Sequence, residues 1–344
     1  MQRMAWLAGM VLLVTLAAGC RGPLQAVTQS RVTMFSSPVE DRGPLVEKDV
    51  VADEGEPCQK IAIVDVDGLL VNSGLVGLGS VGENPVALFR EKLDAVASDP
   101  CYRAVVLRIN SPGGGVTASD IMRHDLLAFR ERPGLPVVAC LMDMATGGAY
   151  YLATAADHVM AHPTTVVGGM GVILNLYNLK DAMAYFNVEA VPVKSGRFID
   201  LGSPVEPMGE EGRAILQRVA DEFHARFQNA VRQARPRHDP SRKEDFDGRV
   251  FTASQALERH LIDSIGYLDD AVAAARQLGG CPTARAVLLR RAHEPARSPY
   301  ATTPNAPVQG SLFPMSIPGL DRSQLPTFLY LWQPEPTFER RAAR

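Results

Sequence analysis

Short apolar runs that alternate with helical patterns constrain the fold of this chain more than any other feature. Residues 61–66, 104–109 and 136–141 are almost continuously apolar, as expected of strands buried on both faces. Residues 85–96 and the segment after Thr117 place apolar side chains at helical spacing. Strands that alternate with helices in this way form parallel sheets. The sequence therefore predicts an α/β domain whose parallel sheets are flanked by helices.

The same pattern continues to about residue 290. Residues 117–120 read Thr-Ala-Ser-Asp and predict a capping box at the start of a helix. Further helices are expected at 210–235, 254–261 and 268–278, and a last strand at 284–289.

The N-terminus has the pattern of an export signal. Arg3 is followed by an apolar run and by the sequence Leu-Ala-Ala-Gly-Cys, which ends at Cys20. The alternative is a transmembrane anchor, but the run of about 15 residues is shorter than the roughly 20 that a spanning helix needs. The ending looks like a bacterial lipobox, so we expect Cys20 to be acylated and the chain to be anchored by lipid to a bacterial membrane, on the extracytoplasmic side of the cell envelope. The sequence leaves inner and outer membrane open.

These features divide the chain into four parts. Prolines interrupt the segment after the signal, and the chain after His293 is again rich in proline. One apolar stretch in this tail, residues 328–332, is expected to dock on the domain or on a neighbouring subunit. The expected parts are a lipoprotein signal peptide at 1–20, a flexible tether at 21–57, a folded domain at 58–292 and a Pro-rich tail at 293–344.

Composition excludes some partners. The formal net charge of −3 gives no reason to expect a nucleic-acid partner. The basic segment 232–249 is interpreted as a solvated loop rather than a patch for acidic lipid head groups. No Cys/His cluster has the spacing of a zinc site, and no cofactor is predicted.

The cysteines other than Cys20 leave two interpretations open. Cys58 and Cys101 each precede a predicted parallel strand, so both could lie at one edge of the sheet. Because an exported protein occupies a compartment where disulfides persist, a bond between them is possible. We favour slightly the other interpretation, in which Cys58, Cys101, Cys140 and Cys281 are unpaired thiols.

Two motifs resemble those of a known family. Residues 110–114 read Asn-Ser-Pro-Gly-Gly, a turn that directs backbone N–H groups outward and is suited to an oxyanion. Residues 143–151 read Asp-Met-Ala-Thr-Gly-Gly-Ala-Tyr-Tyr and are similar to the pattern Asp-x-Ala-Ala-Ser-Gly-Gly-Tyr-Tyr. Residues 155–163 read Ala-Ala-Asp-His-Val-Met-Ala-His-Pro and are similar to Ala-Ala-Asp-x-Ile-x-Ala-x-Pro. Together these segments resemble the signal peptide peptidase A (SppA) type of serine protease, in the ClpP/crotonase superfamily.

Further segments carry the same resemblance. Residues 194–204 resemble Lys-Ser-Gly-Lys-Tyr-Lys-Asp-Ile-Gly-Ser-Pro, and residues 248–266 resemble the family's closing segment. Residues 165–172 resemble Thr-Ile-Thr-Gly-Ser-Ile-Gly-Val, with Gly169 where serine is usual. The resemblance implies repeated β-β-α units and an oxyanion site formed by the amides of Gly113 and Gly114. It also implies a ring-like homo-oligomer.

The chain departs from this family at its two chemical positions. The family nucleophile is a serine four residues after the aspartate that matches Asp143, and Gly147 occupies this position. The family base is the second lysine of Lys-Tyr-Lys, and Ile199 occupies it. Thr146 and Lys194 are the fallback candidates, but neither has the family spacing.

Three functions follow from this pattern. The first is a catalytically inactive relative of the SppA proteases that binds peptides or unfolded segments, or takes part in envelope assembly. The second is an active serine or threonine peptidase of the envelope that degrades signal peptides or membrane-protein fragments with a displaced nucleophile, such as Thr146, Ser111 or Ser195. The third is a crotonase-like acyl-CoA enzyme, which the export signal disfavours.

Overall fold

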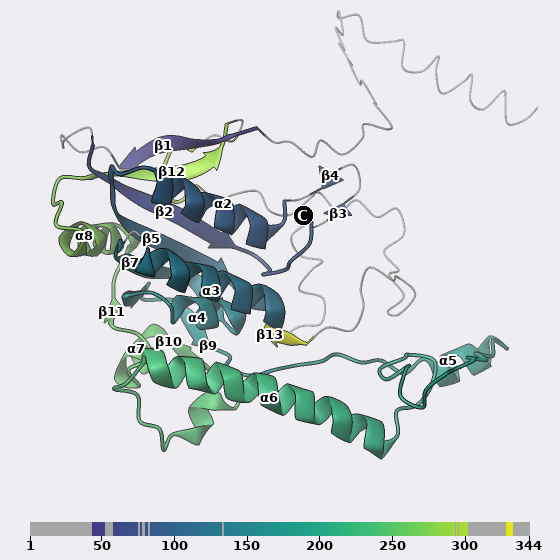
Figure 1. The fold of residues 1–344 in the computed structure, drawn as a ribbon. Helices are drawn as coiled ribbons and strands as arrows, with labels where there is room; N and C mark the ends of the chain where they lie inside the picture. The colour runs from purple at the N-terminus through teal and green to yellow at the C-terminus, as the bar shows by residue number, and fades with distance from the viewer. Residues whose placement is uncertain are drawn as a thin grey trace, which may run out of the picture. The chain divides into compact units, whose positions relative to one another are not determined.

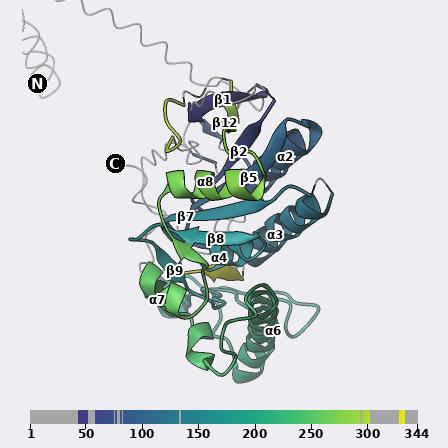
Figure 2. The ribbon, with the colours of Figure 1, turned by 90° about the vertical axis from the view of Figure 1, so that its left-hand side faces the viewer.

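The chain forms a mixed α/β domain built on one large sheet (Figures 1 and 2). The predicted signal peptide, Cys20 and residues 21–42 of the predicted tether lie outside the described residues. Within the part that is described, no helix is long and apolar enough to cross a membrane. The computed structural model describes residues 43–51, 58–74, 76–77, 80–81, 83–132, 134–292, 294, 296–301 and 328–332.

The centre of the sheet is parallel. Its main path runs β1, β12, β2, β5, β7, β8, β11, and β9 pairs with β7 beyond the end of β8. Only the pairs of β1 with β12 and of β10 with β9 are antiparallel in this sheet. The strands are β1 (Leu45–Val51), β12 (Arg285–Arg291), β2 (Lys60–Asp67), β5 (Tyr102–Ser111), β7 (Val137–Thr146), β8 (His158–Ala161), β11 (Ser264–Ile265), β9 (Val166–Gly168) and β10 (Val250–Thr252).

Helices cover both faces of this sheet. Successive strand residues point to opposite faces, so Ala62 and Val64 lie in one buried cluster and Ile61 and Ile63 in the other. The first cluster includes residues of α2 (Pro85–Ser98), α3 (Val116–Glu131), α4 (Gly148–Ala153) and α6 (Glu210–Ala234), whereas the second is closed by α8 (Leu268–Leu278). Figure 2 shows α2 and α3 along one side of the stacked strands. This arrangement confirms the predicted α/β fold with a largely parallel sheet flanked by helices.

The remaining elements are short. The helical ones are α5 (Lys180–Tyr185), the 3₁₀ turn η2 (Lys243–Phe246) and α7 (Ala253–Glu258). Two small antiparallel sheets pair β3 (Val76–Gly77) with β4 (Ser80–Val81), and β13 (Leu329–Leu331) with β6 (Gly113–Gly115).

Two local predictions are wrong. Residues 45–51, assigned to the tether, form β1 instead, because the open edge of β12 supplies hydrogen-bond partners that their mixed sequence does not reveal. The capping box at residues 117–120 does not form, since α3 already begins at Val116 after Gly115, which has no side chain with which to cap. The Ser119 hydroxyl donates back to the Gly115 carbonyl at 2.9 Å.

The favoured interpretation of the cysteines is also wrong. Cys58 and Cys101 form a disulfide with 4.6 Å between their Cα atoms. Both residues lie just before neighbouring parallel strands, β2 and β5, which brings them to the same edge of the sheet. Cys140 and Cys281 are buried free thiols.

Candidate functional site

The glycine turn after β5 is held by its neighbours on both sides. The Gly113 N–H donates to the Ser111 hydroxyl at 3.1 Å. On the other side, the Leu70 N–H donates to the Gly113 carbonyl at 2.9 Å, and the Gly115 N–H donates to the Leu70 carbonyl at 2.8 Å. The predicted oxyanion residues, Gly113 and Gly114, therefore lie in a fixed backbone strand, β6, immediately before α3.

Gly147 lies on the sharp turn between β7 and α4. Its φ of 54° and ψ of −124° are strained for any residue with a β-carbon. Its N–H donates to the Gly168 carbonyl at 2.9 Å, which fixes the turn against β9. A strand-to-helix turn of this kind is how hydrolases expose a nucleophile. Here the position carries no side chain.

The C-terminal segment 328–332 lies between these two turns. Its strand β13 pairs antiparallel with β6, and Tyr330 stands opposite Gly114 (Figure 1, yellow strand beside α3). On its other edge, Leu329 and Ile173 exchange backbone hydrogen bonds of 2.9 and 3.0 Å. The apolar segment that was expected to dock on the domain or a neighbouring subunit is thus an extended strand that is hydrogen-bonded along both edges.

The Tyr330 carbonyl lies where the two turns converge. A β-carbon built on Gly113 would lie 2.1 Å from its oxygen, and one built on Gly147 would lie 2.2 Å from it. In the arrangement implied by the resemblance, a substrate carbonyl lies between the oxyanion amides and the nucleophile. The Tyr330 peptide group occupies that place.

The fallback nucleophiles are bound to backbone groups or lie away from this point. Thr146 is fully buried, and its hydroxyl donates to the Pro112 carbonyl at 3.1 Å. The Ser111 hydroxyl accepts the Gly113 N–H. Ser195 is exposed beside Lys194. The geometry joins Gly113, Gly114, Thr146 and Gly147 in one site but does not bring Ser195 to it.

The two candidate base positions lie in an exposed segment that follows α5. The Ile199 side chain is 73% exposed. The Lys194 ammonium is 2.5 Å from Asp200 and 2.6 Å from Glu206. Hydrogen bonds to these two carboxylates raise the pKa of Lys194, so its amine stays protonated. Ile199 has no amine, and the amine of Lys194 is charged, so neither side chain provides the neutral amine that a general base needs.

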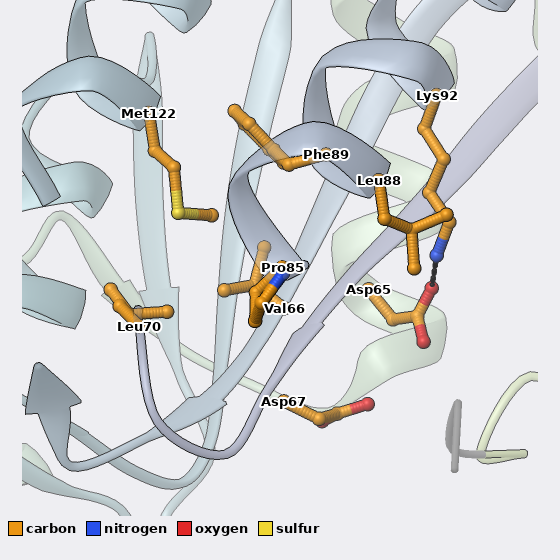
Figure 3. A pocket seen from close by; sticks show the side chains of 9 residues that line it. All are labelled: Asp65, Val66, Asp67, Leu70, Pro85, Leu88, Phe89, Lys92 and Met122. Atoms are coloured by element: carbon orange, nitrogen blue, oxygen red, sulfur yellow. Dashed lines mark hydrogen bonds and ion pairs between the residues drawn. The ribbon is translucent and has the colours of Figure 1, made fainter. Parts of the chain in front are cut away.

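A second cluster of charged groups, which the sequence analysis did not identify, lies beside α2 (Figure 3). The Lys92 ammonium is 2.5 Å from the Asp65 carboxylate, and both side chains are buried. Arg108 lies 3.6 Å from Asp65 and 3.3 Å from Asp67, and it donates to the backbone carbonyls of Pro299 and Ala301. Because its charges are paired, we interpret this cluster as structural. Two sequence signals could have revealed this cluster. Asp65 interrupts an apolar strand, and Lys92 lies on the apolar face of a helix.

The described residues contain no group of three or more side chains placed to hold a metal ion. That no cofactor is bound stays a prediction. The backbone of β6, beside Gly147, pairs with the extended strand β13, and an arrangement of this kind can recognise a peptide backbone.

Comparisons with known proteins identify relatives of this chain. Residues 130–281 match the family model described as peptidase family S49. The chain is 31% identical to protease 4 of Salmonella typhi and 30% identical to the chloroplastic serine protease SPPA of Arabidopsis thaliana, over 63% and 60% of this chain respectively. It is 29% identical to a protein of Enterococcus faecium assigned to the signal peptide peptidase SppA type, over 64% of this chain.

The coverage of these relatives is partial. The chain spans 64% of the Enterococcus protein, but only 34% and 31% of the other two. Among solved structures, the membrane-bound stomatin-specific protease 1510-N matches at 12% identity and a TM-score of 0.39, over 63% of this chain and 84% of that one. The match to peptidase family S49 and these relatives at about 30% identity support the interpretation of this chain as an SppA-type member of that family.

Proposed function

We propose that this chain is a catalytically inactive member of the family that binds extended peptides or unfolded segments at the cell envelope. The observation that carries the proposal is the occupancy of the nucleophile position. Residue 147 has no side chain, and the space that a β-carbon would need is filled by the Tyr330 carbonyl, 2.2 Å away. A covalent acyl-enzyme requires a nucleophilic group at this point.

The position of the general base supports the same conclusion. A lysine acts as a base only when burial keeps it neutral. Ile199 is aliphatic and exposed, and Lys194 is paired with two carboxylates. An oxyanion site without nucleophile and base retains at most a residual acceleration of about 10³–10⁴-fold over water, which is negligible for peptide bonds.

Lipid anchoring and an extracytoplasmic location are part of the proposal. The lipobox-like sequence that ends at Cys20 is its main support. The disulfide between Cys58 and Cys101 adds to it, because such bonds persist in exported proteins and are rare in the cytosol.

A ring-like homo-oligomer is the proposed assembly. The segment around and after α5 presents a row of exposed apolar side chains in the single chain, which a neighbouring subunit could cover. They include Tyr185, Phe186, Val188, Val191, Val193 and Ile199, which are between 52% and 101% exposed.

A fluorophosphonate probe tests the proposal, since it labels only an activated nucleophile. We expect no labelling of the purified chain and no cleavage of casein or of a signal-peptide substrate. Labelling that Thr146→Ala abolishes would instead establish the alternative, an active peptidase with a displaced nucleophile.

A further inference from the structure

We infer that residues 328–332 are the resident ligand of the peptide groove, by which we mean the space between the turn at Gly113–Gly115 and the turn at Gly147, and that they remain there because residues 147 and 169 lack side chains. The inference rests on the proposed peptide-binding function and names the ligand class. The groove takes an extended strand with an aromatic, hydroxyl-bearing anchor flanked by apolar residues.

Tyr330 is the anchor of this strand. Its side chain is fully buried, and its hydroxyl donates to the Phe223 carbonyl at 2.6 Å. Its ring lies 4.8 Å from that of Phe227 and 5.3 Å from that of Tyr151, between centroids. An aromatic pocket closed by a single carbonyl acceptor is suited to tyrosine, because the ring is packed and the hydroxyl is satisfied.

The backbone of the strand is bound on both sides. Val116 donates to the Phe328 carbonyl, and Trp332 donates to the Pro112 carbonyl, each at 3.2 Å. Leu329, between them, exchanges its hydrogen bonds with Ile173 on the opposite side. Main-chain pairing with the edge of a strand is the way in which extended peptides are recognised by strand addition, and here the strand is also paired on its second edge.

Two glycines make room for the strand. Both stand where the resembling family has serine. A β-carbon on Gly147 would lie 2.2 Å from the Tyr330 oxygen and 2.6 Å from its carbonyl carbon, whereas one on Gly169 would lie 2.9 Å from the Trp332 β-carbon. The atoms opposite Gly147 belong to the backbone, so no side-chain rotation can relieve the contact. The loss of a side chain at residue 147 and the presence of the resident strand are therefore coupled.

The resident strand also controls access. It is covalently linked to the domain through residues 302–327, so it competes with free peptides at the high effective concentration of an intramolecular ligand. A free peptide must displace it. Weakening the anchor should therefore strengthen binding of an external peptide to the full chain.

Hydrogen exchange of the full-length protein tests the occupancy. In the wild-type chain the Leu329 amide should exchange slowly. In Gly147→Ala the amides of 328–332 should lose their protection, while Gly134→Ala is the control. Gly134 has a similar φ of 64°, but a β-carbon there meets nothing within 4 Å. Fast exchange in the wild type, or unchanged protection in Gly147→Ala, overturns the inference. Protection that disappears on dilution also overturns it, because the strand would then come from another copy.

A labelled peptide of residues 325–336 tests the ligand class and does not depend on Gly147→Ala folding. Tyr330→Ala should bind this peptide at least about tenfold more tightly than the wild-type chain, with Tyr330→Phe in between. On the Tyr330→Ala protein, a peptide with alanine in place of its tyrosine should bind at least about tenfold more weakly than the unmodified peptide does. Equal binding of the two peptides overturns the anchor. If the strand is released but no peptide binds any variant, the proposed peptide-binding function fails, whereas the occupancy by the resident strand stands.

Discussion

The carbonyl oxygen of Tyr330 lies 2.2 Å from the place that a β-carbon on residue 147 would occupy, and the three nearest atoms to this place all belong to the backbone of β13. The C-terminal strand and a serine at residue 147 therefore exclude each other. An active site in this chain requires a nucleophile, a base and an empty groove. Glycine at residue 147 affects two of these requirements, because it removes the nucleophile and makes room for the strand that fills the groove.

The first prediction concerns restoration of the missing pair. Gly147→Ser or Ile199→Lys alone should leave fluorophosphonate labelling at background, because a hydroxyl without a base, or a base without a hydroxyl, forms no acyl-enzyme. The double variant should be labelled only where an adjoining subunit buries residue 199, since an exposed lysine stays protonated. Labelling should therefore increase with protein concentration. Labelling of Gly147→Ser by itself would contradict this prediction.

The second prediction concerns assembly. We expect the purified protein to form a homo-oligomer through the exposed apolar segment around α5. Replacing Tyr185 and Phe186, which are 86% and 73% exposed, by serine should shift light scattering toward the monomer without loss of the folded state. Tyr300→Ser, at 49% exposure and outside this segment, is the control. A wild-type protein that is only monomeric at micromolar concentration would rule out the ring.

The third prediction concerns the disulfide. Cys58 and Cys101 are 43 residues apart, and the bond restricts the unfolded chain by closing this loop. Replacing both by serine should lower the free energy of unfolding by about 4 kcal/mol, measured by urea denaturation. A reducing agent should destabilise the wild-type protein by a similar amount and leave the double variant unchanged. An equal effect of reduction on both proteins would mean that the bond does not contribute.

The fourth prediction concerns Asp67. Burial raises the pKa of this carboxyl from 3.8 to about 6, the Arg108 guanidinium opposes the shift and the Asp65 carboxylate adds to it. Lys92 is the remaining charged group that faces it. Between these two pKa values the folded protein binds more protons at Asp67 than the unfolded chain does. Its contribution to stability is therefore present at lower pH and is lost as the pH rises through this window.

The loss should be on the order of 2 kcal/mol in the free energy of unfolding. Urea denaturation of Asp67→Asn should show a smaller loss of stability than the wild-type protein between pH 4 and pH 7. Asp94→Asn, which changes a side chain that is 62% exposed, should follow the wild-type profile. Identical profiles for all three proteins would disprove the role of Asp67.

The fifth prediction concerns the anchor. A labelled fatty acid should be incorporated into the protein in bacteria, and Cys20→Ser should abolish incorporation and release the protein from the membrane fraction. Cys281→Ser, which changes a buried thiol of the domain, should leave incorporation intact. Retention of the Cys20→Ser protein in membranes would contradict lipid anchoring.

Several elements were predictable because their signal is local. The apolar runs at 61–66 and 104–109 became β2 and β5, and the helix expected at 268–278 became α8 with the same bounds. Burial of these segments follows from the spacing of their own side chains. The glycines at 113, 114 and 147 were also identified from sequence, because a motif in a fixed order specifies both the turn and its place in the fold.

The sequence by itself determined the α/β fold, the resemblance to the SppA-type proteases, and the presence of Gly147 and Ile199 at the positions that this resemblance assigns to the serine and the lysine, since each depends on residue identity and spacing. Only the tertiary structure decided that 45–51 is a strand, that Cys58 and Cys101 are bonded, and that Lys92 pairs with Asp65. It alone placed Tyr330 between Gly113 and Gly147. These features join residues that are far apart in the chain, and their energy comes from sheet edges and pockets that exist only after folding. A local pattern contains no information about such partners.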